Sequence, residues 1–192
     1  MPGPRSGLVR GPSAPNGPNA SNGPNGAGSS MPLSSPAKAE FWQSYLVGLP
    51  AGHAHRHASP DAFAFGDYAQ LADELAQLVV SGRKRATASL AVEFTSLAQP
   101  LPKAGDLSIV LRSDTTPVAI IELILVQHLA FDAVDAAFAA REGEGDGSLA
   151  YWRAAHRDYF GRVCARLGGQ FNDQTVVICQ SFDVLWTNKG LA

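Results

Sequence analysis

SGRKRATASL, the segment Ser81–Leu90, marks the change from helical to strand-like sequence in this chain. The residues before it have helical periodicity, and Gly82 is the residue type best able to adopt the left-handed conformation that ends a helix. Three successive cations follow, Arg83, Lys84 and Arg85, and then a run typical of a β-strand. We therefore expect a helix to end at Gly82 and to place a basic turn at the start of a strand.

Lys84 and Thr87 can form a nucleophilic pair only if their side chains converge. Residues three apart in a regular strand point to opposite faces, so convergence requires the strand to begin after Lys84. A lysine beside a hydroxyl can act as its base if the ammonium loses its proton near neutral pH. We expect Arg83, Arg85 and partial burial to lower the pKa of Lys84. Ser89 adds a second hydroxyl two residues after Thr87. The alternative is a solvated basic turn that binds nothing.

The composition indicates one globular domain preceded by a tail. The chain has 192 residues, 45% of them hydrophobic, and a formal net charge of −2. A balance so close to neutral argues against binding duplex nucleic acid by charge alone, which needs many clustered cations. Residues 1–36 are rich in Pro, Gly, Asn and Ser and are predicted to be disordered, and Met31 is an alternative start. The domain is predicted at residues 37–188.

The sequence also predicts a reducing, cytoplasmic environment. Cys164 and Cys179 lie in apolar patterns outside any CxxC spacing, so we expect reduced core residues, with a disulfide as the alternative. No apolar run has the length of a membrane span, and the first residues lack the apolar stretch of a signal peptide. We therefore expect no membrane partner.

Helical and strand-like patterns alternate along the domain, which predicts an α+β fold: a small closed β-barrel decorated by helices. Asp67, helped by Gln70, is the expected cap of the second helix, and Ser148 that of the last. The last helix should be closed by Gly168 and Gly169. The expected helices are 38–49, 67–81, 132–141 and 148–167, and the expected strands are 86–94, 107–111, 118–126 and 176–186.

Two polar features outside the basic turn have competing interpretations. His53, His55 and His57 alternate and would share a face of a strand that could hold a metal, but Gly52 and a following proline bracket a loop, so we expect a solvated segment and no metal. Glu122 lies inside the apolar run AIIELILV. A carboxylate there must face solvent, find a partner or line a cavity.

The acidic segment EGEGDGS and the helix after it supply the remaining candidates. Glu142 or Glu144 could approach the basic turn and would then keep Lys84 charged, and the alternative is a solvated loop. Helical spacing directs Trp152 and His156 inward. His156 is either a core histidine with a backbone partner or a pocket residue able to move a proton. Trp152 is either core or a flat face for a base.

Four segments follow one another in a recognisable order. They are GRKRATASL, LPKAGDLSIVL, FDAVDAAFAAREGEGDGSLAYWRAAHRDYF and VVICQSFDVLW. The most specific element is G-x-K-x-x-T, formed by Gly82, Lys84 and Thr87. Together with the GD turn, the EG loop and the W-x-x-x-H helix, this order resembles the ASCH domain family over about residues 40–187.

The resemblance implies a β-barrel similar to the PUA domain, with a cleft beside the barrel at the signature. Members of the family are regarded as RNA-binding modules, and small bacterial members act as amidohydrolases on N4-acetylcytidine with a Lys, a Thr and a Glu. Carried over, these residues are Lys84, Thr87 and Glu142, with Glu144 as the alternative to Glu142. This chain is longer and has an additional FWQSY helix, Trp152 and His156, so the substrate does not transfer directly.

We therefore expect an ASCH-like domain that binds RNA or a modified nucleoside in a cleft around the signature, without a cofactor. The alternatives are an amidohydrolase, a ribonuclease, and a regulatory module that meets another protein through its tail or first helix. The oligomeric state does not follow from the sequence. The catalytic candidates are Lys84, Thr87 and Glu142, and the substrate-binding candidates are Gly82, Arg83, Arg85, Ser89, Glu122, Glu144, Trp152 and His156.

Overall fold

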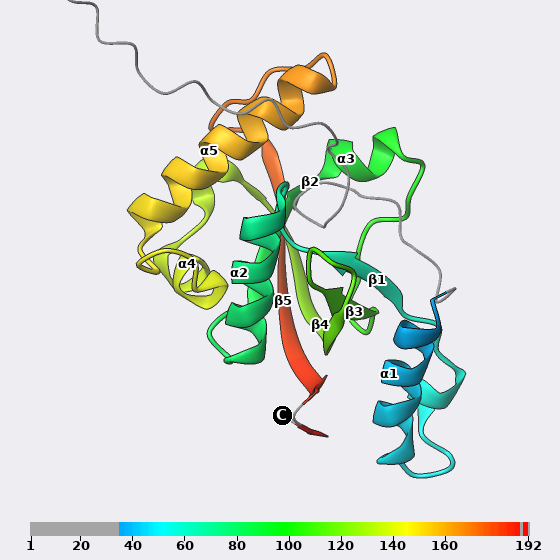
Figure 1. Ribbon diagram of the computed structural model, residues 1–192. Coiled ribbons are helices and arrows are strands. Elements are labelled where there is room, and N and C mark those ends of the chain that lie inside the picture. Colours follow the sequence, from blue (N-terminus) through cyan, green and yellow to red (C-terminus); the bar gives the residue numbers. More distant parts are fainter. Residues whose placement is uncertain (1–34, 189, 192) are drawn as a thin grey trace, which may run out of the picture.

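A strongly curled sheet forms the centre of the protein (Figure 1), seen in a computed structural model that describes residues 35–188 and 190–191. The spatial order of the strands is β1-β3-β4-β5-β2, with β6 added to the end of β5. Only β1 and β3 are parallel, and every other pair is antiparallel. The strands are β1 (Asp61–Ala64), β2 (Ala86–Leu90), β3 (Leu107–Leu111), β4 (Pro117–Ala130), β5 (Val176–Thr187) and β6 (Gly190–Leu191).

The long strands β4 and β5 give the sheet its shape. β4 pairs with β3 and β5, and β5 pairs with β4 and β2. The register of β4 against β5 shifts at two bulges, between Ile120 and Ile121 and between Leu123 and Leu125. Bulges bend a strand and increase its twist. The predicted α+β, PUA-like fold class is confirmed, although the sheet is a half-barrel: in the described residues, the edge strands β1 and β2 do not pair with each other.

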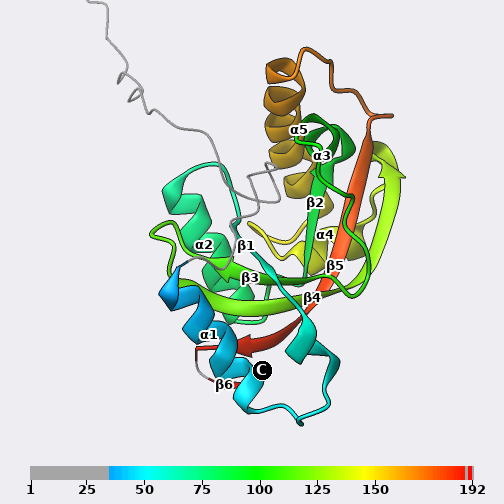
Figure 2. The same ribbon diagram turned by 90° about the vertical axis from the view of Figure 1, so that its right-hand side faces the viewer.

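Three clusters of buried apolar residues pack the helices α2, α1 and α5 against the sheet. The group around α2 packs on the concave face with Phe65 and Phe182, and the group around α1 packs on the opposite face with Ile109. The third group packs α5 against the far ends of β2 and β5. Figure 2 shows α1 and α2 at one end of the sheet and α5 at the other. The helices are α1 (Pro36–Val47), η1 (Ala54–His57), α2 (Ala69–Val80), α3 (Ala91–Ser96), η2 (Phe131–Ala133), α4 (Ala136–Glu142) and α5 (Leu149–Arg166).

Two local predictions are wrong. The strand expected at 86–94 ends at Leu90, because the carboxylate of Glu93 accepts a hydrogen bond from the Leu90 N–H at 2.9 Å and starts α3. Asp67 does not cap α2. The N-cap of that helix is Tyr68, which makes no side-chain capping bond, and Asp67 instead pairs with Arg162 at 2.6 Å. A carboxylate with a nearby guanidinium gains more from a charged hydrogen bond than from a neutral N–H.

Other local predictions are confirmed. Gly82 ends the second helix with a φ of +84°, and the Ser148 hydroxyl accepts from Tyr151 N–H at the start of α5. Gly168 follows α5 with a φ of +77°. Cys164 and Cys179 are free and buried.

The histidine segment forms η1, where His55 Nδ1 lies 2.7 Å from the Tyr45 hydroxyl. Within the described part of the chain, no three His, Cys, Asp or Glu side chains are grouped so as to hold a metal ion. Among the helices of residues 35–188, none combines the length and the hydropathy that a bilayer-spanning segment needs. The predictions of a disordered tail and of a start at Met31 lie almost wholly outside the described residues.

Candidate functional site

The turn after α2 carries Lys84 into the protein. Arg83 N–H and Lys84 N–H both donate to the carbonyl of Leu78, which the positive φ of Gly82 allows. Arg85 N–H then donates to the carbonyl of Arg141 at 2.8 Å, and so ties the start of β2 to the end of α4. The Lys84 side chain is 0% exposed. The interpretation of this turn as a solvated basic surface is therefore wrong for Lys84.

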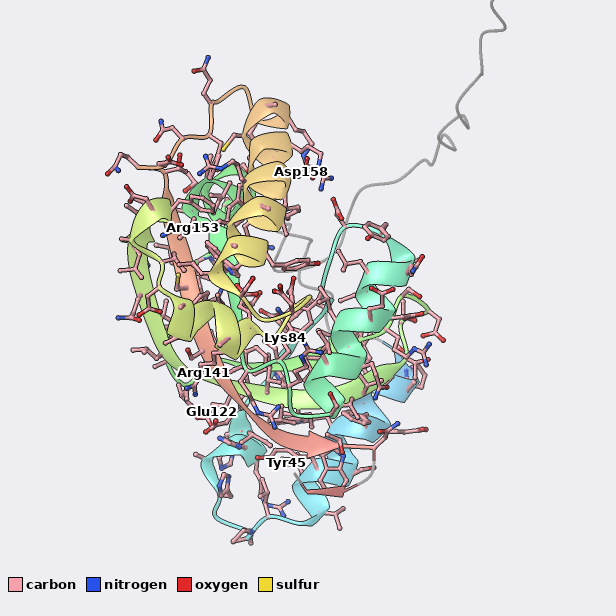
Figure 3. All side chains as sticks on the ribbon, turned by 90° about the vertical axis from the view of Figure 1, so that its left-hand side faces the viewer. Tyr45, Lys84, Glu122, Arg141, Arg153 and Asp158 are labelled. Atoms are coloured by element: carbon pink, nitrogen blue, oxygen red, sulfur yellow. The ribbon has the colours of Figure 1, made fainter. Side chains whose placement is uncertain are left out.

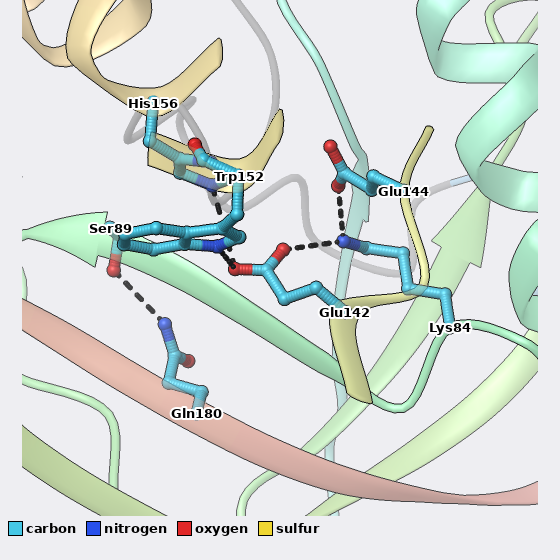
Figure 4. Close-up of polar contacts among 7 residues, drawn as sticks. All are labelled: Lys84, Ser89, Glu142, Glu144, Trp152, His156 and Gln180. Atoms are coloured by element: carbon cyan, nitrogen blue, oxygen red, sulfur yellow. Dashed lines mark hydrogen bonds and ion pairs between the residues drawn. The ribbon is translucent and has the colours of Figure 1, made fainter. Parts of the chain in front are cut away.

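Lys84 ends between two carboxylates (Figure 4). Its Nζ lies 2.9 Å from Glu142 Oε2 and also donates to Glu144 Oε1. Gly143, between the two glutamates, has a φ of +66°, and a Cβ at this position would lie 2.4 Å from the Arg83 carbonyl oxygen. Only glycine permits this close approach without strain. The acidic segment is therefore folded against the basic turn rather than solvated.

The second oxygen of Glu142 is held from the other side by α5. Trp152 Nε1 donates to Glu142 Oε1 at 2.8 Å, and His156 Nε2 lies 3.5 Å from the same oxygen. His156 Nδ1 lies 3.0 Å from the Trp152 carbonyl oxygen, one turn away. Both interpretations of His156 thus have support, because the ring has a backbone partner and also faces a carboxylate. Glu142 itself is 0% exposed.

The charges in this cluster stabilise one another. Burial alone would lower the pKa of Lys84, but the carboxylates of Glu142 and Glu144 outweigh it and hold that pKa above its ordinary value. Burial likewise would raise the pKa of Glu144, but Lys84 and His156 hold it below the ordinary value. The expectation that Arg83, Arg85 and burial lower the pKa of Lys84 is therefore wrong, and the lysine is a cation at neutral pH.

Thr87 lies on β2 opposite Gln180 of β5 and on the wall of a cavity of about 530 Å³. The cavity lies between the sheet and the segment that joins α3 to β3. Gln180 Nε2 donates to the Ser89 hydroxyl at 3.0 Å, which fixes the amide beside Thr87. The aromatic rings of Phe63 and Phe94 line the same cavity. Lys84 is not among its lining residues, so the structure places Lys84 in the ion-pair cluster and Thr87 on the cavity wall.

Trp152 and Glu122, two of the predicted substrate-binding residues, do not lie where they could contact a ligand beside Thr87. Trp152 offers no free face to a base, because Phe131 stacks on it with centroids 5.2 Å apart and His156 with centroids 4.3 Å apart. Glu122 is partly exposed and lies 4.0 Å from His55, near Tyr45 and away from Lys84 (Figure 3). Glu122 therefore has the partner that the sequence suggested as one of three options.

The side chains of Arg83 and Arg85 bond to backbone carbonyl groups next to the turn. Arg83 Nη2 donates to the carbonyl of Gly145, and Arg85 Nη1 donates to the carbonyl of Val79 at the end of α2. Gln180 is a site residue that the sequence analysis missed. Its signal was present, since it is a polar residue in the middle of the apolar run VVICQSF.

The sequence model of the ASCH domain matches residues 61–186, which contain the signature, the glutamates and α5. The chain belongs to the ASCH domain family. The FWQSY helix α1 lies outside the matched part of this ASCH domain.

Two solved structures resemble this ASCH domain. A crystal structure of an ASCH domain from Lactobacillus crispatus JV V101 is 32% identical, with a TM-score of 0.71, and the match covers 76% of this chain and 92% of that one. A protein from Enterococcus faecalis V583 is 34% identical with a TM-score of 0.65, and the match covers 76% and 86% of the two chains. No match was found among curated proteins.

Proposed function

We propose that this ASCH domain binds a nucleoside or an unpaired base of RNA in the cavity beside Thr87. The observation that carries the proposal is the cavity itself, which has a volume of about 530 Å³ and joins aromatic walls to a fixed amide and a hydroxyl. Ligand sites of small molecules typically have volumes of roughly 300–1,000 Å³ and combine apolar walls with a few placed polar groups.

The lining residues suit a flat, polar-edged ligand. Phe63 and Phe94 provide aromatic surface, and Gln180 and Thr87 provide groups that can donate or accept hydrogen bonds. Proteins that recognise RNA sequence generally bind unpaired bases by stacking and by hydrogen bonds to the base edges. A net charge of −2 is compatible with such local recognition, which does not need a broad cationic surface.

Binding is tested by calorimetric titration of the full chain with N4-acetylcytidine, cytidine and a short single-stranded RNA. We expect Gln180→Ala to weaken binding roughly tenfold, because a buried hydrogen bond to a ligand is worth about 1–2 kcal/mol. Gln43→Ala is the matched control, since Gln43 is an exposed glutamine of α1 that does not line the cavity. Equal affinities for both variants, or no heat with any of the three probes, would refute the proposal.

Hydrolysis of an N4-acetylated cytidine is the second candidate. One contact favours it: Lys84 and Glu142, two of the three residues carried over from the amidohydrolases, are 2.9 Å apart. In that reaction Thr87 Oγ1 would attack the acetyl carbonyl and become acetylated, while its proton passes through Lys84 and Glu142 to the departing amine. This transfer requires the Lys84 side chain to leave its place between the glutamates and reach the cavity wall at Thr87. Water would then release acetate. Because Lys84 is held protonated, it must first pass its proton to one of the two glutamates.

Release of cytidine from N4-acetylcytidine, followed by chromatography, separates the two candidates. Thr87→Val keeps the shape of the side chain and removes the nucleophilic oxygen, so it should abolish turnover while the protein stays folded. Turnover by the valine variant at the normal rate would exclude Thr87 as the nucleophile. Lys84→Arg keeps the charge but cannot act as a base, and it should also stop turnover.

A further inference from the structure

The second half of β4 is an open sheet edge. The partners of β4 on β3 end at Glu122, and the last backbone bonds on that side join Leu123 to Gly105 and Asp106. In the described residues, the stretch Leu125–Ala130 pairs with β5 alone, after a bulge at Ile124. Figures 2 and 3 both place this half of β4 at the outer rim of the molecule.

The alternation of the backbone tells which groups point outward. Phe182 N–H donates to the carbonyl of Arg85, so the backbone of Phe182 faces β2. Alternation along β5 then directs the backbone of Cys179 to its β4 partner, Gln127. Val126 and His128 lie on either side of Gln127 in the chain. Their backbone N–H and C=O groups therefore point away from β5. These groups have the geometry to pair with another strand.

Within residues 35–188, this edge lacks the usual protection against pairing. Its sequence, ILVQHLA, contains no Asp, Glu, Lys, Arg or Pro. Ile124 and Leu125 are 43% and 48% exposed. Natural sheets usually block open edges with charged residues, prolines or covering segments, and an apolar edge without them is a site of strand addition.

We propose that a second copy of this chain pairs with the edge, antiparallel and about a two-fold axis through Gln127. In this register Val126 faces His128 of the second copy, and the outward N–H and C=O groups of the two residues bond to each other. Leu125 faces Leu129, and Gln127 faces its own copy, where the two amides can bond because each has a donor and an acceptor.

The segment complements itself, which favours a second copy over a foreign strand. No charged residue meets a like charge in this register, and the exposed Leu125 side chains find apolar partners. Most homo-oligomers are two-fold dimers in which the same patch serves both copies. A register centred on His128 would instead place two imidazoles opposite each other. The proposal does not depend on the ligand cavity.

Light scattering coupled to size exclusion tests the proposal on the full chain. We expect the mass of two chains for the wild type and of one chain for Leu125→Lys, because the added ammonium must be desolvated against Leu129. Leu167→Lys is the matched control, since Leu167 is 39% exposed at the end of α5, and it should remain a dimer. A monomeric wild type, or a dimeric Leu125→Lys variant, would overturn the proposal.

Disulfide trapping tests the register. Directly opposite residues of this type lie with Cα atoms about 4.5 Å apart, within the range that a disulfide bridges. Because Cys179 is the cross-strand partner of Gln127, the trapping uses a Cys179→Ala background, in which Gln127→Cys should form a covalent dimer under mild oxidation while the buried Cys164 stays unreacted. His128→Cys should not, because its counterpart is Val126. Equal cross-linking of the two variants, or none with Gln127→Cys, contradicts the two-fold register.

Discussion

Replacing Lys84 by methionine tests the buried ion-pair cluster most directly. Methionine is similar in length but has no charge, so Glu142 and Glu144 keep their positions and lose their common cation. Removing one partner of a buried ion pair typically costs about 3–5 kcal/mol, because the remaining charge is left uncompensated. We expect a loss of this size at pH 7, which is a large share of the roughly 5–15 kcal/mol that stabilises a domain.

The structure explains why rearrangement of neighbouring groups will not recover the lost stability. Glu142 is 0% exposed, so water cannot replace the ammonium without opening the site. Trp152 Nε1 already donates to the other carboxylate oxygen at 2.8 Å and cannot serve both. Glu144, with a side chain 14% exposed, can turn toward solvent more easily. Most of the cost therefore comes from Glu142.

The pH dependence follows from the signs of the pKa shifts. The raised pKa of Lys84 stabilises the protein fully at neutral pH, and this contribution is lost only as the pH rises through the folded value. The lowered pKa of Glu144 stabilises it above the ordinary carboxyl pKa and is lost as the pH falls. In Lys84→Met the attraction of the lysine is gone, and burial then acts to raise the pKa of Glu144. The gap in stability between wild type and Lys84→Met should therefore narrow from pH 7 to pH 5.

Urea unfolding followed by tryptophan fluorescence measures the free energy of unfolding of each variant at pH 7 and at pH 5, provided that the transition is two-state. Lys103→Met is the matched control, because Lys103 pairs with Asp106 on the surface and its side chain is 80% exposed. It should have little effect at either pH. The cluster does not hold a lysine cation between two carboxylates if the two substitutions lower the free energy of unfolding equally. The same follows if the difference in that free energy between wild type and Lys84→Met is constant with pH.

Two further predictions concern the backbone and the thiols. Gly143→Ala should lower the melting temperature clearly more than Gly147→Ala, because a Cβ at Gly143 meets the Arg83 carbonyl while one at Gly147 meets nothing within 4 Å. Both changes share the left-handed strain of roughly 1–2 kcal/mol, so equal shifts would contradict the contact. Cys164 and Cys179 should react with a thiol reagent at pH 8 only after unfolding, since burial raises both pKa values, that of Cys179 to about 12. Rapid labelling of the native protein would contradict this.

The ends of several elements could be predicted because they depend on local chemistry. The stop at Gly82 and the cap at Ser148 need only the conformational preferences of neighbouring residues. Local patterns gave wrong predictions where a partner distant in the sequence competes. Asp67 pairs with Arg162 instead of capping α2, and the pKa of Lys84 is set by the glutamates rather than by the adjacent arginines.

By itself, the sequence determined the class of fold, the family and the order of the four helices and four strands that it predicted, but not the strand β1 or the helix α3. Only the tertiary structure decided that Lys84 bonds to Glu142, 58 positions away, and that Thr87 and Gln180 line a cavity while Trp152 supports a carboxylate. The physical reason is that burial removes water from charged and polar groups, so their pKa values and partners depend on whatever the fold brings within about 3 Å.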